Sequence, residues 1–308
     1  MLRTFFVRLS ENSSLRSFAE RSSLGRRVSG RFVAGTEIAD AVRATQVVNR
    51  AGMSVSIDNL GENVTNPEEA RHSAELYHEI LDAITAEKLD ANISLKLTHM
   101  GLDVDESLAR EIVSGLVAKA ASMNPPGFVR VDMEGSPYTQ HTLDFVHELH
   151  RMPGNANSVG TVIQSYLKRS ERDVEKLLAE NIRIRLCKGA YKESADIAFA
   201  AKSDVDANYV KLMKILMKSG IYHGLATHDE NIVRQAEAFA RSEKISPDSF
   251  EFQMLYGIRR DLQQSLVRKR WRVRVYIPFG TEWYPYFMRR LGERPANVFF
   301  IARNLLRS

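Results

Sequence analysis

Eight short stretches of alternating apolar and polar residues recur along the chain, and longer amphipathic segments separate them. The predicted strands are 53–58, 92–97, 128–133, 159–164, 182–187, 222–227, 250–255 and 272–277. Helical periodicity follows at 67–88, 105–123, 139–151, 168–180, 203–219, 229–242 and 258–269, with a last helix at 282–292. Eight strand-helix units are the number that closes a parallel barrel. No stretch has the G-x-G-x-x-G turn of a dinucleotide fold, so a doubly wound sheet is the weaker alternative.

The size and composition fit one large domain. The chain has 308 residues, of which 44% are hydrophobic and 26% charged, as in ordinary soluble globular proteins. We predict a barrel domain over 53–308 and an N-terminal helical arm over 1–52, with a helix at 37–51. Cys187 is the only cysteine, so no internal disulfide can form and a reducing compartment is indicated.

In every predicted strand one parity is apolar. In the second strand, for example, Ile93, Leu95 and Leu97 alternate with polar residues. The apolar face of a barrel strand meets the helices, so the polar face must point into the barrel, and its last members surround the carboxyl-terminal mouth where barrel enzymes place their chemistry. The residues predicted to share one cavity there are Asp58, Lys96, Asp132, Gln164, Arg185, Thr227 or His228, Gln253 and Tyr276.

Other charged residues sit earlier on their strands. We predict that most of Arg130, Arg183, Glu251, Arg272 and Arg274 form an internal ion-pair layer that fills the barrel, because charges buried there need partners.

The fifth strand carries arginine inward and opens into a short loop of Lys188, Gly189 and Ala190. A glycine lets the backbone approach a bound group, and a lysine supplies a positive point charge. This pattern indicates that an anion or an electron-rich ring is held there. A surface strand with solvated arginines is the alternative.

The last predicted helix places Tyr286, Arg289, Arg290 and Glu293 on one face. Two adjacent guanidinium groups beside a tyrosine can clamp a carboxylate, because the planar fork pairs both oxygens. The alternative is an exposed basic helix end that the helix dipole favours.

Taken together, residues 30–300 resemble proline dehydrogenase, the flavin enzyme of proline catabolism. The resemblance rests on motifs whose order and spacing agree: DNLGE at 58–62, SLKL at 94–97, RVDME at 130–134, VIQSY at 162–166, RLCKGAY at 185–191, ATHD at 226–229, FQMLYG at 252–257 and YFMRR at 286–290. It implies a monofunctional enzyme with a distorted (βα)8 TIM-type barrel whose final helix caps the active site. It also implies FAD bound without a Rossmann motif, L-proline as substrate and Δ1-pyrroline-5-carboxylate as product, with electrons passed to a quinone or another acceptor.

The resemblance assigns roles toward the cofactor. Arg185 would lie near flavin N5, Gln164 would meet the pyrimidine edge, and Met133 would contact the cofactor. The ribityl-pyrophosphate portion would be held by the remaining members of this group, which are Lys188, Gly189, Ala190, Thr227 and His228.

The resemblance also assigns roles toward the substrate. Asp132 carries over as the active-site acid that orients Tyr276 or its neighbours, and Glu62 as a gate that pairs with Arg290 when the site is empty. The proline carboxylate would be bound by Lys96, Arg289 and Arg290, and the ring pocket would be shaped by Leu255, Tyr276 and Tyr286.

Two rival functions remain open from the residues. An interior Lys96 also fits a Schiff-base aldolase, although an aldolase explains neither the arginine pair nor the Lys188 loop. The basic run 268–272 with Trp271 has a composition seen in nucleic-acid grooves, but it leads straight into a strand. With a net charge of only +5, we predict no nucleic-acid partner.

Metal and membrane signals are weak. His147 and His150 lack zinc-protease spacing, and we interpret them as part of an exposed helix face with no metal. No apolar run is long enough to span a membrane. The amphipathic tail at 297–307 leaves open a peripheral contact with the inner face of the membrane, and otherwise we predict a cytoplasmic protein.

Overall fold

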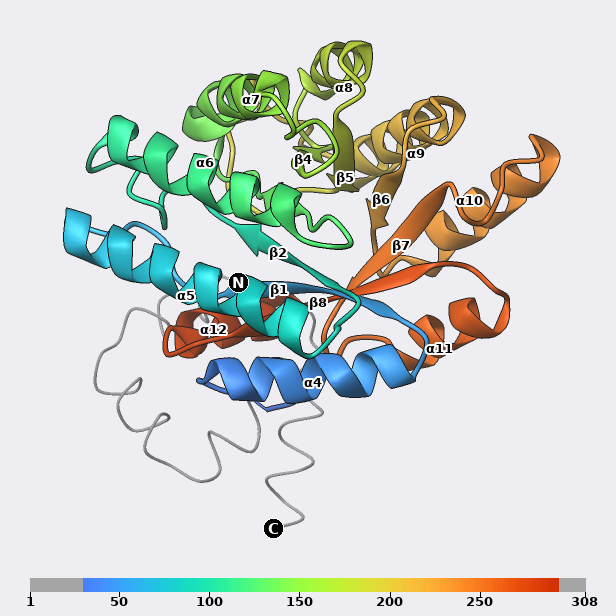
Figure 1. Cartoon of the computed structure of the whole chain (residues 1–308). Helices are drawn as coiled ribbons and strands as arrows, with labels where there is room; N and C mark the ends of the chain where they lie inside the picture. The colour runs from blue at the N-terminus through green and yellow to red at the C-terminus, as the bar shows by residue number, and fades with distance from the viewer. Residues whose placement is uncertain (1–29, 294–308) are drawn as a thin grey trace.

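Eight parallel strands close a barrel in sequence order (Figure 1). The computed structural model describes residues 30–293, whereas 1–29 and 294–308 lie outside the described part. The strands are β1 (Ser54–Asn59), β2 (Ala91–Leu95), β3 (Val129–Val131), β4 (Val159–Gln164), β5 (Arg183–Cys187), β6 (His223–Ala226), β7 (Phe250–Leu255) and β8 (Val273–Phe279). The predicted TIM-type barrel is therefore confirmed.

The helices form the outer layer around the strands (Figure 1). In chain order they are α4 (Ile38–Arg50), α5 (Pro67–Ala86), α6 (Glu106–Ser122), α7 (Ser136–Arg151), α8 (Ser170–Ala179), α9 (Lys202–Lys218), α10 (Glu230–Ser242), α11 (Arg260–Arg268) and α12 (Trp283–Glu293). Several begin where the sequence offers a cap. Asn66 accepts a hydrogen bond from the backbone of Glu69 and precedes a proline, and Asp105 and Asp229 cap α6 and α10 in the same way.

Helices α4 and α12 depart from a simple repeat. Helix α4 packs on β1 and β8 and contributes Ala41, Ala44 and Val48 to the main core, so it covers the strands at the seam where the barrel closes. Helix α12 instead packs on residues from other loops, Phe32 and Ile258 among them. The assignment of 1–52 to a separate arm stays a prediction, because most of that segment lies outside the described residues.

The strand faces follow the predicted parity. On β1 and β2, Val55, Ile57, Ile93 and Leu95 belong to the main apolar core and are at most 1% exposed. The intervening polar residues are buried as well, because they fill the barrel interior. Burial of the apolar parity against the helices is the main favourable contribution to folding.

The interior polar layer is only partly the ion-pair layer that the sequence predicts. Arg274 donates to Glu251 over 2.7 Å inside the barrel. Arg130 donates from Nη1 to the backbone carbonyls of Thr161 and Arg183 instead of to a carboxylate, and its buried Nε has no hydrogen-bond partner among the described residues. Arg272 does not belong to the layer, because it is exposed at the amino-terminal rim and pairs with Asp248.

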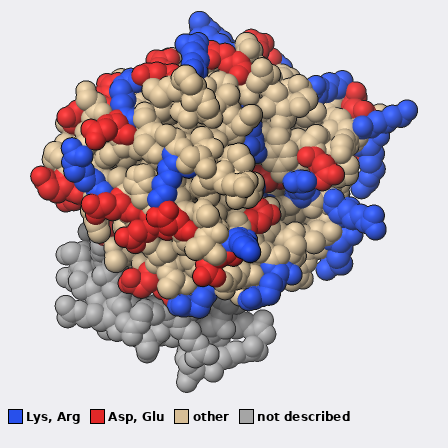
Figure 2. All heavy atoms as spheres, in the orientation of Figure 1, with Lys and Arg blue, Asp and Glu red and all other residues tan. Residues whose placement is uncertain are grey.

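Figure 2 shows acidic side chains gathered over α5, where Glu68, Glu69, Glu75, Glu79 and Asp82 are all exposed. Basic side chains gather on the opposite edge, over α10 and α11. Among residues 30–293, no helix is long and apolar enough to cross a bilayer. The tail at 297–307 lies outside the described residues.

The buried pair inside the barrel generates a stability prediction. Arg274→Met leaves the Glu251 carboxylate buried without its counter-charge, so we expect the free energy of unfolding in urea to fall by about 3–5 kcal/mol. Arg234→Met, which removes an exposed arginine 3.3 Å from Glu230 on α10, should change it by less than about 0.5 kcal/mol. Equal losses in the two variants would contradict a structural role for the interior pair.

Candidate active site

A cavity of about 670 Å³ opens at the carboxyl-terminal mouth of the barrel. Most of the predicted site residues lie together in its wall: Lys96, Asp132, Met133, Gln164, Arg185, Lys188, Gly189, Ala190, Thr227, His228, Gln253, Leu255 and Tyr276. Asp58 is buried beside Lys96, just behind this wall. The structure thus brings groups from β2 to β8 around one cavity.

Arg185 occupies the centre of the site. Its Nη1 donates to Asp132 Oδ1 over 2.6 Å and to Ser94 Oγ over 3.1 Å, and its Nε donates to Gln253 Oε1. Its guanidinium carbon lies 5.2 Å from the centre of the Tyr276 ring. Because β5 places this side chain inward with 6% exposure, it presents a fixed positive charge to the cavity.

Asp132 links the other polar groups. Beyond Arg185, it accepts a hydrogen bond from Ser94 Oγ over 2.7 Å, and its second oxygen accepts from the Tyr276 hydroxyl over 2.9 Å. Burial and the charges of Asp132 and Asp58 raise the pKa of Tyr276 well above its usual value, so the phenol keeps its proton. This hydrogen bond from the Tyr276 hydroxyl to Asp132 holds the Tyr276 ring in place.

Lys96 and Asp58 form a buried charge pair with 4.0 Å between Nζ and Oδ2. Burial lowers the pKa of Lys96, but Asp58, Asp132 and Glu62 outweigh burial, and the net shift is upward. A Schiff-base lysine needs the opposite shift, since the neutral amine is the nucleophile. The electrostatics therefore disfavour the aldolase alternative.

Gln164 offers an unused acceptor. Its amide nitrogen donates to the carbonyl of Met133 over 3.3 Å, whereas its buried Oε1 has no hydrogen-bond partner among the described residues. An orphaned acceptor in a cavity wall costs free energy unless a ligand N–H fills it. The residue thus suits the N–H edge of a heteroaromatic ring.

In the loop after β5, Lys188 and Gly189 make contacts within the protein that the sequence did not predict. Lys188 already contacts two carboxylates, with Nζ 2.6 Å from Asp206 and 2.9 Å from Asp229. Gly189 has φ +104°, and a Cβ there would lie 2.3 Å from the Tyr166 ring. Packing against Tyr166 and the backbone conformation therefore require this glycine, whatever ligand approaches it.

Thr227 and His228 follow β6 at the rim of the cavity. The Thr227 hydroxyl accepts from the backbone N–H of Asp229 over 3.0 Å, and His228 Nε2 accepts from the backbone N–H of Leu255 over 2.9 Å. These bonds fix the rim of the cavity between β6 and β7.

Tyr286 and Glu62 are not among the residues that line this cavity. Tyr286 on α12 is 8% exposed and belongs to an apolar cluster that Leu255 packs against. Glu62 lines a neighbouring cavity of about 950 Å³, and Lys96 lines both cavities. Arg289 and Arg290 fall on α12, but their side chains are outside the described part, so the clamp and the pairing of Glu62 with Arg290 stay predictions.

Sequence reasoning missed the small hydroxyl groups that hold Arg185. Ser94 and Ser56 both contact its guanidinium, and Ser56 also donates to Asn92. Both serines belong to the inward parity, which was the available signal. A serine on this face suggests no particular chemistry by itself, so parity alone does not single out Ser56 or Ser94.

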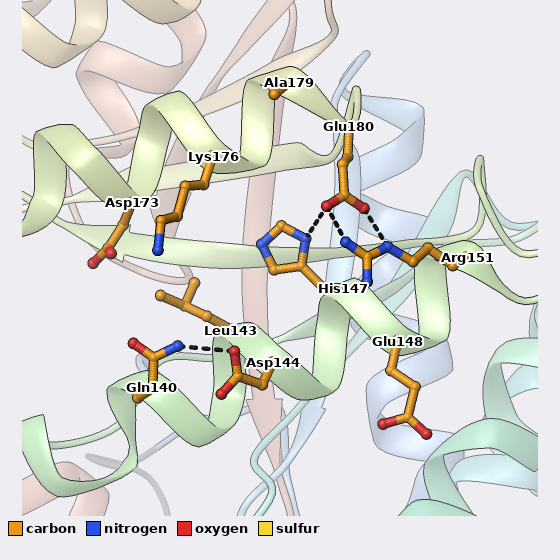
Figure 3. A pocket seen from close by; sticks show the side chains of 10 residues that line it. All are labelled: Gln140, Leu143, Asp144, His147, Glu148, Arg151, Asp173, Lys176, Ala179 and Glu180. Atoms are coloured by element: carbon orange, nitrogen blue, oxygen red, sulfur yellow. Dashed lines mark hydrogen bonds and ion pairs between the residues drawn. The ribbon is translucent and has the colours of Figure 1, made fainter.

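A separate cavity of about 660 Å³ lies outside the barrel, and Figure 3 shows the side chains of α7 and α8 that line it. Here Glu180 is contacted by His147 over 2.9 Å and by Arg151 over 2.6 Å. The predicted exposed histidine face is wrong for His150, which is buried, and His147 is half-buried. The apolar residues of α7 pack on the core, so this edge of the helix lies against the core. No group of three potential metal ligands exists among residues 30–293.

Comparison with known proteins gives consistent results. The family model described as proline dehydrogenase matches residues 41–303. "Proline dehydrogenase 1" of Bacillus subtilis subsp. natto is 40% identical, with 100% of both chains covered. "Proline dehydrogenase" of Deinococcus radiodurans is also 40% identical and covers 90% of this chain and 89% of its own.

Solved structures match the fold. Proline utilization A of Bdellovibrio bacteriovorus, inactivated by N-propargylglycine, superposes with a TM-score of 0.82 at 24% identity, covering 94% of this chain and 36% of that chain. The present chain therefore spans about a third of that protein's length.

The buried carboxyl of Asp58 leads to a prediction about how the free energy of unfolding depends on pH. Burial raises its pKa to about 6, with Lys96 opposing and Asp132 adding to the shift, against 3.8 for the ordinary group. Between these values the folded protein keeps a proton that the unfolded chain has lost, so this carboxyl lowers stability as pH rises from about 4 to about 6. The free energy of unfolding of wild type minus that of Asp58→Asn should fall by about 3 kcal/mol across this window, measured in urea. A difference that stays flat or rises would show that Asp58 is not the titrating group.

Proposed function

The chain belongs to the proline dehydrogenase family, and we propose that it oxidises L-proline to Δ1-pyrroline-5-carboxylate with FAD bound at the carboxyl-terminal mouth of the barrel. The single observation that carries the proposal is the grouping of Arg185, Gln164 and Lys96 around one cavity. Each supplies a different recognition chemistry: a fixed cation, an open amide acceptor and a protonated amine.

The residues present fit a flavin. The buried, unpartnered Oε1 of Gln164 can accept from the ring N–H, and the charge of Arg185 can stabilise negative charge on a reduced ring. The bound cofactor would supply an acceptor for the hydride from the carbon next to the proline nitrogen, and a quinone or another acceptor would then take the electrons. Lys188 would turn from Asp206 and Asp229 toward the pyrophosphate.

The chain's own groups would orient the substrate. Lys96, held protonated by its carboxylate neighbours, binds the proline carboxylate together with Arg289 and Arg290 from α12. Tyr276, fixed by Asp132, and the apolar pair Leu255 and Tyr286 shape the ring pocket. Holding the reacting carbon near the acceptor supplies much of the rate enhancement, because it converts a bimolecular encounter into an ordered one.

The visible spectrum tests the proposal. Purified protein should show a flavin band that L-proline bleaches without oxygen. Gln164→Leu should keep the fold, since Gln164 makes only one side-chain donor bond, to Met133 over 3.3 Å, but should bind FAD about tenfold or more weakly. A colourless wild-type protein that cannot be reconstituted with FAD, or a band that proline leaves unchanged, would refute the function.

Lys96 separates this function from the aldolase. Lys96→Met should raise the KM for proline by about ten- to a hundredfold, because a charge-assisted hydrogen bond to the carboxylate is lost. Lys211→Met, which removes an exposed lysine on α9, should leave KM unchanged. Covalent trapping of Lys96 by borohydride with a carbonyl compound, together with an unchanged KM, would favour the aldolase.

A further inference from the structure

A cavity of about 540 Å³ lies at the opposite, amino-terminal mouth of the barrel. The first residues of β1, β5 and β8 and the segments before β2, β4, β6 and β7 form it. Its charged and polar lining is Ser54, Asp90, Asn157, Asn181, Arg183, Tyr222, Asp248, Arg272 and Arg274. The cavity shares no lining residue with the one assigned to FAD and proline.

Arg183 has an unusual environment in this cavity. No hydrogen bond or carboxylate contact reaches its guanidinium from the described residues, and its Nε is buried without a partner. Arg183 is half-buried, but its Nε is fully buried, and a buried donor without an acceptor costs free energy.

Two aromatic rings hold this guanidinium. Its central carbon lies 4.3 Å from the ring centre of Phe128 and 4.9 Å from that of Tyr222. Rings cover the faces of a guanidinium and leave its N–H edge available. The edge of Arg183 is therefore pre-oriented at low entropic cost.

The neighbouring carboxylates are committed elsewhere. Asp248 pairs with Arg272 over 2.8 Å, and Asp90 accepts from the Ser54 hydroxyl over 2.6 Å. Deeper in the barrel, Glu251 is shared by Arg274 and the Tyr222 hydroxyl. Arg183 is thus the cation of this cavity that lacks a carboxylate partner within residues 30–293.

We propose that the amino-terminal mouth is a binding site for a small carboxylate, held by the N–H edge of Arg183. A planar carboxylate matches the guanidinium fork with two parallel hydrogen bonds. Arg272 stands 5.9 Å from the same Tyr222 ring, so a second carboxylate group of a dicarboxylate can reach it. The volume lies within the range of small-molecule sites.

The competing explanation is that Arg183 stacks on Phe128 and Tyr222 only to stabilise the fold. The amino-terminal face of such barrels usually serves stability, and stacking alone can retain an arginine. A structural stack needs no ligand, so direct binding measurements separate the two.

Succinate, titrated calorimetrically into the FAD-loaded protein, is the probe, and succinamide is the matched uncharged control. We expect saturable binding of one succinate and none of succinamide. Arg183→Met should weaken succinate binding at least about tenfold, whereas Arg234→Met, on the exposed face of α10, should not change it. Absence of saturable succinate binding, or equal binding by Arg183→Met, overturns the proposal.

Two further variants keep the test decisive. If Arg183→Met fails to fold, Arg183→Lys retains the charge without the fork, and weaker binding supports the site while unchanged binding overturns it. Lys96→Met changes the cavity proposed for FAD and proline, so it should not alter succinate binding at the amino-terminal mouth. If only Lys96→Met abolishes binding, the succinate occupies the catalytic cavity and the proposal fails.

Discussion

The hydrogen bonds of the Arg185 guanidinium are the interactions on which the rest of the site depends. The guanidinium lies inside a closed barrel and makes hydrogen bonds to side chains of β1, β7 and the segment after β3. A charge buried this deeply costs free energy unless a counter-charge and hydrogen-bond acceptors compensate for the lost water. The serines, the glutamine and the aspartate are therefore a consequence of placing arginine there. The same bonds leave its charge facing the cavity and its position fixed.

Polar contacts continue from Arg185 along the barrel axis. Gln253 accepts from Arg185 and donates to Glu251, which binds Arg274 and Tyr222 near the other mouth. The two mouths are thus joined by a chain of hydrogen bonds through a polar interior. Glycine makes room for it, since a Cβ at Gly224 would lie 2.3 Å from the Gln253 amide. The interior of this barrel is fixed by directional bonds, and the apolar packing lies outside the strands.

The sequence predicts which strand faces point into the barrel, but not how deep each residue lies or which residues it contacts. Period-two alternation determines which face of a strand points inward, so the barrel and the wall of the catalytic cavity follow from it. It does not determine depth along the axis, which is why Arg272 was assigned to the interior although it lies on the rim. Nor does it reveal contact partners, because Arg130 binds backbone carbonyls and Gly189 packs against Tyr166 from the loop after β4. Such contacts join residues distant in sequence.

The charged residues beside the candidate active-site cavity also have partners that the sequence pattern does not reveal. Lys188 and Lys202 face Asp206 and Asp229, so this cluster carries no net charge without a ligand. A pyrophosphate can contact Lys188 only if it displaces the carboxylates of Asp206 and Asp229. Part of the attraction between the pyrophosphate and Lys188 would then offset the loss of these ion pairs. These groups are roughly a quarter exposed, apart from Lys202, which is mostly exposed, so water and salt screen them. In the proposed FAD site, affinity for the cofactor would therefore come mainly from Gln164 and Arg185, which are buried and held in place by hydrogen bonds.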